Sequence, residues 1–482
     1  MMSEAKRLHP VSILFHVITT TRQIFFALLP IILLAINDFK WLHLILGLII
    51  VIVFLLGFSI LKWLRFTYQI EQDQLRIDQG VFVRQKRTIS KHRIQSIDLT
   101  QNVIHRIFGL TKVQIETAGS NLNVDASLSA VTFAEGKWLH DQLKYHNNNT
   151  PVDTEDNQVD QQVEKQYPTR QISWKMLILA GSTSGSFGIL LALIGFASSE
   201  AESLIPDSFY KETTSWIFSQ AIPTLILLSI ILLIGIYIVG ILSTLIKYGN
   251  FTITRYEEEL YITRGLLEKK QMTIPLKRIQ VVGIKQSIIR EPLGLATVFV
   301  EIAGGEVDER EGTETLLFPI LFKKEIKPFL AEIIPEYNAL PDKFQSIPKR
   351  ALPYYFVRAA WLPIIASIIV ALFWFKWIWV PLLILTISII FGFLRFRTNG
   401  YDLTDKQLTL RLRHFSKDII MLRRRRIQAF ETQQHVLHRK QRLATTNSSI
   451  LNNFAGRHYK LNEIESDGAD EIGKWYSYQT KG

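Results

Sequence analysis

The feature that most constrains the fold of this chain is an internal repeat. The tripeptide Arg-Ile-Gln occurs three times, and in each copy a further Gln follows six residues after the first. The residues concerned are Arg93, Gln95 and Gln101, then Arg278, Gln280 and Gln286, and finally Arg426, Gln428 and Gln434. The second copy starts 185 residues after the first (278 − 93), and the third starts 333 residues after it (426 − 93). A fixed period of this kind predicts one structural unit repeated along the chain, here three times.

The residues that flank the tripeptide match between the first two copies without a gap. Those of the first copy are Leu75, Ile77, Gly80, Gly109, Leu110 and Glu116, and they align with Leu260, Ile262, Gly265, Gly294, Leu295 and Glu301. The third copy has diverged: Leu408 and Leu410 preserve the apolar positions, but Arg413 and Arg442 stand where the other copies have glycine. Because these glycines are typical of turns, the sequence leaves open whether the third copy keeps them.

Long apolar runs precede each copy. Of the 482 residues 48% are hydrophobic, and they gather in runs that approach the roughly 20 residues needed to cross a bilayer. We predict three transmembrane hairpins, hence six transmembrane helices, within residues 1–62, 172–246 and 350–395. The net charge is +12, with basic residues beside the span ends, for example Lys62, Arg65, Lys247 and Arg397. Since positive charge stays on the cytoplasmic side, both termini and all the polar blocks of this multi-pass protein are predicted to lie in the cytoplasm, at the plasma membrane.

Each hairpin is followed by a polar block, in residues 63–145, 247–338 and 396–482. The first block alternates apolar and polar residues in strand fashion, as at Tyr68 and Ile70 or Val113 and Ile115, and it closes with a helix that carries Trp138. We therefore expect several strands and one C-terminal helix in each block. Residues 146–171 contain few apolar side chains, which predicts a disordered linker.

Several strands closed by one helix are the outline of a pleckstrin-homology-like (PH-like) domain, a β-sandwich or barrel of the α+β class. The chain resembles the bacterial membrane-flanked PH-like domain proteins of the YdbT and YdbS type, and most of all their long, three-domain branch. The resemblance covers almost the whole chain. It rests on the three hairpins, the Arg-Ile-Gln core and a Gly-Leu pair before a strand, Gly109-Leu110 and Gly294-Leu295. It implies a PH-like fold for each block and a small, single-domain membrane protein of the same family as a partner.

The sequence offers little for catalysis. Cysteine is absent, which excludes disulfides, thiolate nucleophiles and cysteine-based metal sites. His435 and His438 could meet across one helical turn, but no third metal ligand is evident. The resemblance brings no catalytic residue either. We therefore predict no catalytic residue, no metal site and no cofactor, and expect that the protein is not an enzyme.

The Arg and Gln residues of the repeat are the first candidate site. An arginine on a sheet edge can bind a phosphate or carboxylate through two parallel hydrogen bonds. The alternative is structural: a residue that recurs in every copy of a duplicated fold more often satisfies a backbone group within its own domain. The sequence favours the structural interpretation without excluding binding.

A basic cluster in the third block is the second candidate. It comprises Arg423, Arg424, Arg425, Arg439, Lys440 and Arg442. Each charge near an anionic leaflet contributes about 1 kcal/mol of attraction, so these residues are candidate contacts for anionic lipid. Cytoplasmic charge bias alone explains the cluster equally well. Nucleic acid is not predicted, because the run of arginines lacks interleaved aromatic residues.

The sequence thus favours a non-enzymatic membrane scaffold whose three PH-like domains bind a partner membrane protein, anionic lipid headgroups or both. Gly181 and Gly185, in G-x-x-x-G spacing, are predicted to let transmembrane helices pack closely. Self-association of the chain is left open. The alternatives are a transporter or export component with a site between the hairpins, and a membrane enzyme.

Overall fold

The computed structural model describes residues 5–21, 24, 41–71, 74–117, 126–144, 167–184, 222–303, 314–451 and 456–477. The chain divides into two compact units. The first combines Met1–Gln166 with Leu267–Pro275, and the second contains Tyr167–Leu266, Leu276–Ala303 and the chain from Val307 onward. Each unit is described by itself.

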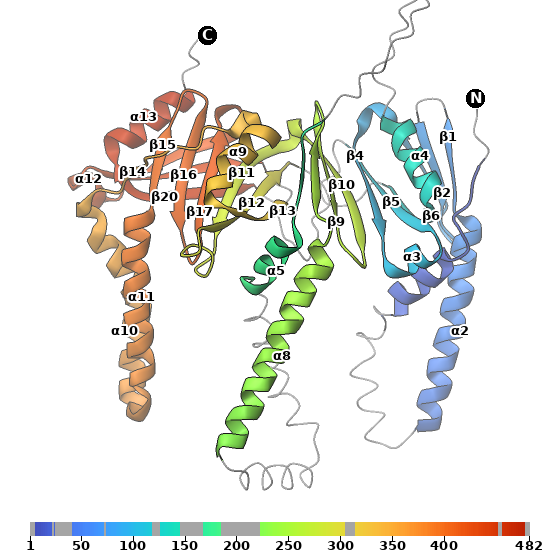
Figure 1. The fold of residues 1–482 in the computed structure, drawn as a ribbon, viewed down its shortest axis with the longest axis horizontal. Helices are drawn as coiled ribbons and strands as arrows, with labels where there is room; N and C mark the ends of the chain where they lie inside the picture. Colours follow the sequence, from blue (N-terminus) through green and yellow to red (C-terminus); the bar gives the residue numbers. More distant parts are fainter. Residues whose placement is uncertain are drawn as a thin grey trace, which may run out of the picture. The chain divides into compact units, whose positions relative to one another are not determined.

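In the first unit a short apolar helix (Ser12–Thr21) precedes a long apolar helix, α2 (Trp41–Arg65), which runs directly into two antiparallel sheets (Figure 1). The first sheet contains β1 (Thr67–Glu71), β2 (Gln74–Gln79) and β3 (Gln85–Ser90), and the second contains β4 (Ile94–Gln101), β5 (Leu110–Thr117) and β6 (Ala126–Thr132). The short helix α3 (Val103–Ile107) joins β4 to β5, and α4 (Phe133–Lys144) follows β6. Strands and one closing helix are the arrangement that the sequence predicts.

The core of this unit lies between the sheets and α4. Residues that alternate along the strands point inward, so Leu75, Ile77, Val113, Ile115 and Leu128 are each at most 3% exposed. Leu139 of α4 is fully buried against them. The two-residue period of the apolar positions therefore places one face of each sheet against the closing helix.

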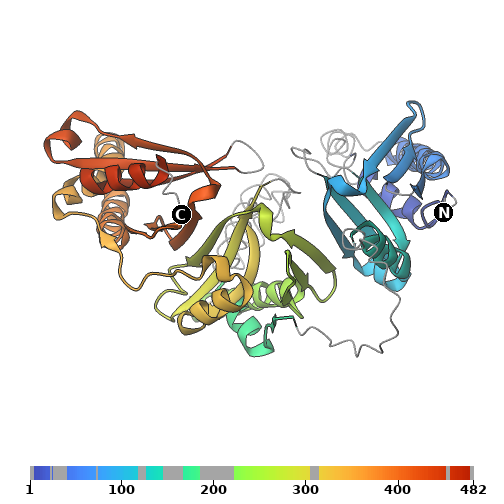
Figure 2. The same ribbon diagram turned by 90° about the horizontal axis from the view of Figure 1, so that it is seen from above.

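The second unit carries the rest of the chain in the same order. Helix α8 (Ile222–Tyr248) leads into β8 (Thr252–Arg255) and β9 (Glu259–Arg264), and β11 (Ile279–Gln286), β12 (Leu295–Ile302), β13 (Thr315–Phe322) and α9 (Lys323–Ile333) follow. The third copy contains α10 (Leu352–Phe373), α11 (Trp379–Thr398), β15 (Gly400–Leu403), β16 (Gln407–Arg413) and β17 (Lys417–Arg423). It ends with β18 (Ile427–Gln433), α12 (Val436–Lys440), β19 (Leu443–Ile450), β20 (Arg457–Glu465) and α13 (Ser466–Ser477). Figure 2 shows α13 lying across the sheet of β18, β19 and β20.

Successive copies share their sheets. In the first unit β10 (Lys269–Pro275), a strand of the second copy, pairs with β4 of the first. In the second unit β17 of the third copy pairs with β11 of the second along six residue pairs. As a result one sheet of the second unit has the order β13, β12, β11, β17, β16, β15 and β14 (Gln345–Ser346). Backbone hydrogen bonds between strands therefore join one copy of the repeat to the next.

The predicted disordered linker was wrong at its C-terminal end, where the structure has a short strand before the hairpin. Residues 169–171 were expected to belong to the disordered segment, yet β7 (Thr169–Gln171) pairs with β8. A similar strand, β14 (Gln345–Ser346), pairs with β15, and Lys6 forms an isolated bridge with Tyr68. The exposed side chains of β7 and β14 give no apolar alternation, so the sequence pattern could not reveal these strands. The rest of the predicted linker that precedes Tyr167 lies outside the described residues.

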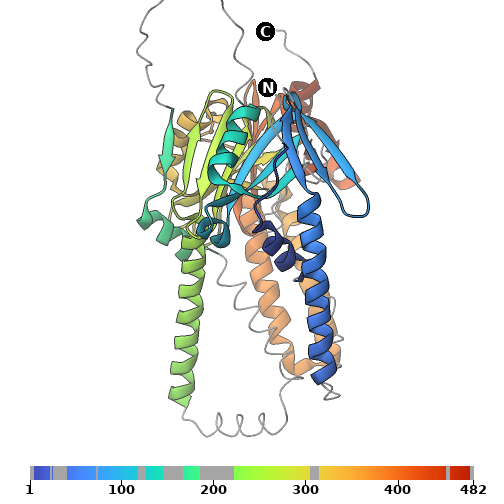
Figure 3. The ribbon, with the colours of Figure 1, turned by 90° about the vertical axis from the view of Figure 1, so that its right-hand side faces the viewer.

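Three helices among the described residues are long and apolar enough to cross a membrane: Ile230–Tyr248, Lys349–Phe373 and Phe375–Thr398. The last two form the third hairpin, in which α10 and α11 lie side by side (Figure 3). Ser388 of α11 donates a 2.7 Å hydrogen bond to the carbonyl of Ala359 in α10. Six spans were predicted; most of the first span of each of the other two hairpins lies outside the described residues.

The third copy keeps one glycine turn and replaces the other. Gly109 and Gly294 both have φ of +65°, and Arg442 adopts φ of +51° at the same repeat position. Gly80 and Gly265 have φ of +112° and +102°, whereas Arg413 has no positive φ and ends β16 beside a shorter hairpin loop. An arginine thus occupies the left-handed region, where a side chain costs about 1–2 kcal/mol.

We expect Arg442→Gly to raise the free energy of unfolding by about 0.5–1 kcal/mol, because relief of the left-handed strain exceeds the entropy that glycine loses on folding. The thermal unfolding midpoint of the purified protein in detergent measures this change. Gly294→Ala is the matched control: no described atom lies within 4 Å of the added Cβ, but the backbone is left-handed, so the midpoint should fall. A lower midpoint for Arg442→Gly would show that the arginine side chain stabilises the turn.

Candidate functional site

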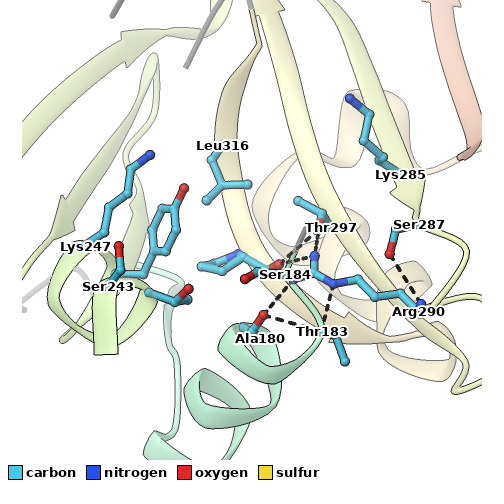
Figure 4. A pocket seen from close by; sticks show the side chains of 13 residues that line it. Ala180, Thr183, Ser184, Ser243, Lys247, Lys285, Ser287, Arg290, Thr297 and Leu316 are labelled. Atoms are coloured by element: carbon cyan, nitrogen blue, oxygen red, sulfur yellow. Dashed lines mark hydrogen bonds between the residues drawn. The ribbon is translucent and has the colours of Figure 1, made fainter. Parts of the chain in front are cut away.

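A cavity of about 400 Å³ lies in the second unit, where the helices of the second hairpin meet the strands that follow. Helix α5 (Trp174–Ser182) contributes Ala180, and α8 contributes Ser243 and Lys247. The turn between β11 and β12 contributes Arg290, and β11 itself Lys285 (Figure 4). Segments that are far apart in the sequence therefore build one pocket with three basic side chains.

Arg290 is the central cation of this pocket. Its Nε donates to Thr183 Oγ1 at 3.0 Å, one terminal nitrogen donates to the carbonyl of Ala180 at 3.1 Å, and the other contacts Pro319 O at 3.3 Å and Thr297 Oγ1. All these partners are uncharged oxygens. Burial lowers the pKa of the Arg290 guanidinium. Among the described residues no carboxylate forms an ion pair with Arg290, so this partly buried charge has no counter-charge within the part of the chain that the structure describes.

The two lysines add charge around Arg290. Lys247 lies in the last turn of α8 and is exposed, with its Nζ 5.1 Å from the centroid of the Tyr248 ring. Lys285 Nζ forms a 2.5 Å ion pair with Glu314. Ser184, Ser243 and Ser287 bring hydroxyl groups to the lining. Guanidinium, ammonium and hydroxyl groups that converge on one cavity are the donors that bind a phosphate or carboxylate.

Gly181 holds α5 against α8 and so places one wall of the pocket. A Cβ on Gly181 would lie 3.1 Å from the Cα of Ile241 in α8 and 3.3 Å from its carbonyl oxygen. The missing side chain lets the end of α5 reach the position from which Ala180 and Thr183 contact Arg290. The other residue of the predicted packing pair, Gly185, lies outside the described residues.

Arg290 does not stand out in the sequence by any local motif, although the repeat offers a signal for it. His105, Arg290 and His438 are separated by the repeat spacing, so each copy has a basic side chain at this position. His105 Nε2 lies 2.8 Å from the carbonyl of Ser129 and its ring stacks on Phe15, while His438 contacts Tyr354 edge to face. Burial lowers the pKa of both histidines. Of the three equivalent positions, only the second has an arginine, which stays charged at any physiological pH.

The Gln residues of the repeat core contact backbone groups inside their own domains. Gln101 Nε2 donates to the carbonyl of Leu110 at 2.8 Å, and Gln286 makes the equivalent bond to Leu295 at 3.1 Å. Gln280 donates to the carbonyl of Arg278. The bonds of Gln101 and Gln286 therefore join the end of one strand to the start of the next. In the third copy Gln428 and Gln434 are exposed, and Gln95 is half-buried.

The arginines of the repeat core lie in three different surroundings. Arg278 is 7% exposed, and its Nε donates to the carbonyl of Ala303 at 2.8 Å. Arg93 is exposed, and Arg426 is half-buried with its charge near the ring of Tyr337. No single pocket collects these residues among the described parts of the chain, and the contacts of Arg278 agree with the structural interpretation.

The predicted lipid contacts of the third copy form two groups rather than one. Arg423, Arg424 and Arg425 come directly before β18, whereas Arg439, Lys440 and Arg442 come after it, in and behind α12. An extended strand of seven residues separates the groups by roughly 20 Å. Arg424 contacts the ring of Trp475 and the carbonyl of Tyr476. The second group lies beside the start of α10, since Arg350 donates to the carbonyl of Arg442.

A buried charge cluster lies where the second and third copies meet. Glu301 of β12 is fully buried, 2.6 Å from a terminal nitrogen of Arg457 and 2.7 Å from the hydroxyl of Tyr459, both in β20. Arg457 also contacts Glu314 at 3.0 Å. Burial raises the pKa of the Glu301 carboxyl despite the nearby arginine. The pKa of Glu314 is lowered, because hydrogen bonds and charges from Lys285 and Arg457 together outweigh its burial.

Comparison with known proteins finds the same three-part organisation. Residues 24–146, 204–333 and 352–480 each match the family described as "Bacterial PH domain". The chain is also 31% identical, over 494 aligned residues, to the UPF0699 transmembrane protein YdbT of Bacillus subtilis (strain 168). That match covers 99% of this chain and 99% of its relative. No solved structure matches the chain.

Proposed function

Because this chain belongs to the family of transmembrane proteins with bacterial PH domains, we propose that it is a non-enzymatic membrane scaffold. Its three PH domains bind anionic lipid headgroups and a partner membrane protein at the surface of the cell envelope. The observation that carries the lipid half of this proposal is the pocket around Arg290, whose charge lacks a carboxylate partner among the described residues.

The proposed topology has six spans in three hairpins, with both termini and all three PH domains in the cytoplasm. Each of α2, α8 and α11 carries basic residues in its last turn and leads directly into the first strand of a domain. Positive charge at these helix ends supports a cytoplasmic location. The pocket then lies at the depth of the inner-leaflet headgroups, because Lys247 ends the apolar helix α8.

Apolar side chains beside the pocket support a lipid ligand. The turn that carries Arg290 exposes Ile288, Ile289 and Leu293, each by more than half of its surface. Grouped apolar side chains beside basic residues are typical of surfaces that enter the boundary between headgroups and acyl chains. In this arrangement the three side chains contact acyl chains, and Arg290 and Lys247 bind the phosphate of the same lipid.

The test is the retention of added lipid by purified protein, measured by native mass spectrometry in detergent. We expect wild-type protein to bind phosphatidylglycerol in preference to phosphatidylcholine. Lys247→Ala should weaken this binding about fivefold, the effect of one charge at the headgroup layer. Arg290→Gln should weaken it about tenfold or more, because a charge-assisted hydrogen bond is lost.

The matched control is Lys277→Ala, which removes a lysine from the same copy of the repeat. Lys277 is 81% exposed and pairs with the exposed Glu258, away from the pocket. This variant should bind phosphatidylglycerol as the wild type does. Equal lipid binding by all three variants would contradict the proposal. If inorganic phosphate displaced bound phosphatidylglycerol as effectively as added phosphatidylglycerol does, the pocket would be a site for free anions instead.

A further inference from the structure

Two of the strands that end a sheet among the described residues are equivalent to strands that are paired on both sides elsewhere in the chain. β3 ends the sheet of β1, β2 and β3, and β18 ends the sheet of β18, β19 and β20. Inside the chain the equivalent strands are paired: β4 with β10, and β11 with β17. The first copy therefore presents one half of the junction that joins successive copies, and the third copy presents the other half.

The two internal junctions use the same register. Lys269 pairs with Gln101 in the first, and Lys417 pairs with Gln286 in the second. Lys269 and Lys417 occupy the same position of the repeat, as do Gln101 and Gln286. The two junctions therefore pair equivalent residues of successive copies. Because register in a sheet is set by side-chain pattern, its recurrence indicates a specific mode of assembly between PH domains.

Exposure distinguishes the paired strands from the unpaired ones. Along β11 every residue except Lys285 is buried, whereas Ile427 is the one buried residue of β18 and Ile89 that of β3. The charges on β3 do not prevent pairing. The equivalent strand β10 carries Lys269 and Lys270 and still pairs with β4. Exposed edges with the pairing pattern of an existing junction are templates for another strand.

We propose that β3 of one molecule pairs with β18 of a second copy of the same chain, which repeats between molecules the junction found within the chain. The internal register places Gln85 opposite Gln433, Lys86 opposite Thr432 and Arg87 opposite Glu431. The last pair is complementary in charge, and both residues are exposed. Such a head-to-tail contact joins two different surfaces, so it forms a closed ring or an open row.

This inference specifies the partner in the partner-binding half of the proposed function and is independent of the headgroup pocket. The natural absence of cysteine allows a direct test without background thiols. Two differently tagged chains, one with Gln85→Cys and the other with Gln433→Cys, are produced together and oxidised in their membranes. Directly opposed residues of an antiparallel pair have Cα atoms about 4.5–5.5 Å apart, within the range of a disulfide.

We expect a disulfide-linked dimer that carries both tags. The positive control is Thr100→Cys with Lys270→Cys, which occupies the same repeat positions at an internal junction and should crosslink within one chain. The slipped control is Gln85→Cys with Thr432→Cys, whose side chains point to opposite faces and should crosslink poorly. Glu431→Lys should lower the yield of the Gln85–Gln433 crosslink about two- to fivefold, and adding Arg87→Glu should restore it.

Absence of the two-tag dimer, while the positive control crosslinks, would overturn the inference. Formation of the Gln85–Gln433 disulfide within one chain that carries both cysteines would overturn it as well. Trapping of a different protein at either edge would also reject a second copy as the occupant, but it would leave the partner-binding half of the proposed function standing.

Discussion

Arg457→Ala is expected to lower the free energy of unfolding by about 3 kcal/mol. The substitution leaves Glu301 fully buried and without its arginine partner. Removing one member of a buried ion pair typically costs about 3–5 kcal/mol, because the remaining charge is desolvated without compensation. The lower end applies here, since the side chain of Arg457 is 34% exposed and Tyr459 still donates to Glu301.

The measurement is the thermal unfolding midpoint of the purified protein in detergent, followed by intrinsic fluorescence. Arg350→Ala is the matched control in the same unit. Its ion pair with Glu465 has side chains that are 42% and 46% exposed, and exposed pairs contribute less than about 1 kcal/mol. If both variants lowered the midpoint equally, the buried cluster would not be a main contributor to the junction between the second and third copies.

Gly283→Val is expected to destabilise the same junction by about 3 kcal/mol. Gly283 lies in the middle of β11, opposite Phe299 of β12 on one side and Ile420 of β17 on the other. A Cβ at this position would lie 2.1 Å from Cζ of Phe299. Phe299 is 2% exposed and packed in the core, so its ring must shift to make room for an added side chain. Overpacking of this kind typically costs 1–3 kcal/mol, and valine adds more than one carbon.

The thermal midpoint again measures the effect. Gly240→Ala is the control, because no atom of the described residues lies within 4 Å of an added Cβ at this helical position and alanine favours a helix. A Gly283→Val protein that unfolds at the wild-type midpoint would show that the core around Phe299 can rearrange. The close packing between the two copies would then not depend on the missing side chain.

Local patterns in the sequence predicted the parts of the fold that depend on nearby residues. The repeat spacing predicted three copies, and the alternation around Leu75 and Ile77 predicted strands whose apolar side chains are buried. The structural interpretation of the repeat core agrees with the bonds of Gln101 and Gln286. These features follow from local periodicity within each copy.

Pairing between copies could not be predicted in the same way. Apolar alternation shows which face of β10 is buried but not that its neighbour is β4 of the preceding copy. The strand β14 has two residues and carries no pattern. Because arginine replaces glycine at two positions of the third copy, the sequence did not decide whether its turns are left-handed. The structure shows a left-handed backbone at Arg442.

The pocket was not predicted because its chemistry depends on Arg290 having no carboxylate partner among the described residues, which only the folded chain reveals. Arg290 is one of many basic residues in the sequence, and its neighbours Ala180 and Lys247 come from distant segments. What distinguishes Arg290 is a partly buried charge surrounded by neutral oxygens. In contrast, the predicted cluster around Arg423 is separated by β18 into two groups.

The most direct test of the scaffold proposal is native mass spectrometry of the protein purified in mild detergent from its own membrane. The proposal predicts a chain that retains anionic phospholipid and is associated with another membrane protein chain, a second copy according to the edge pairing. Weaker retention of the lipid by Lys247→Ala and Arg290→Gln, with unchanged retention by Lys277→Ala, would locate the lipid in the pocket. A bare monomer that carries neither anionic lipid nor a partner would contradict the proposed function.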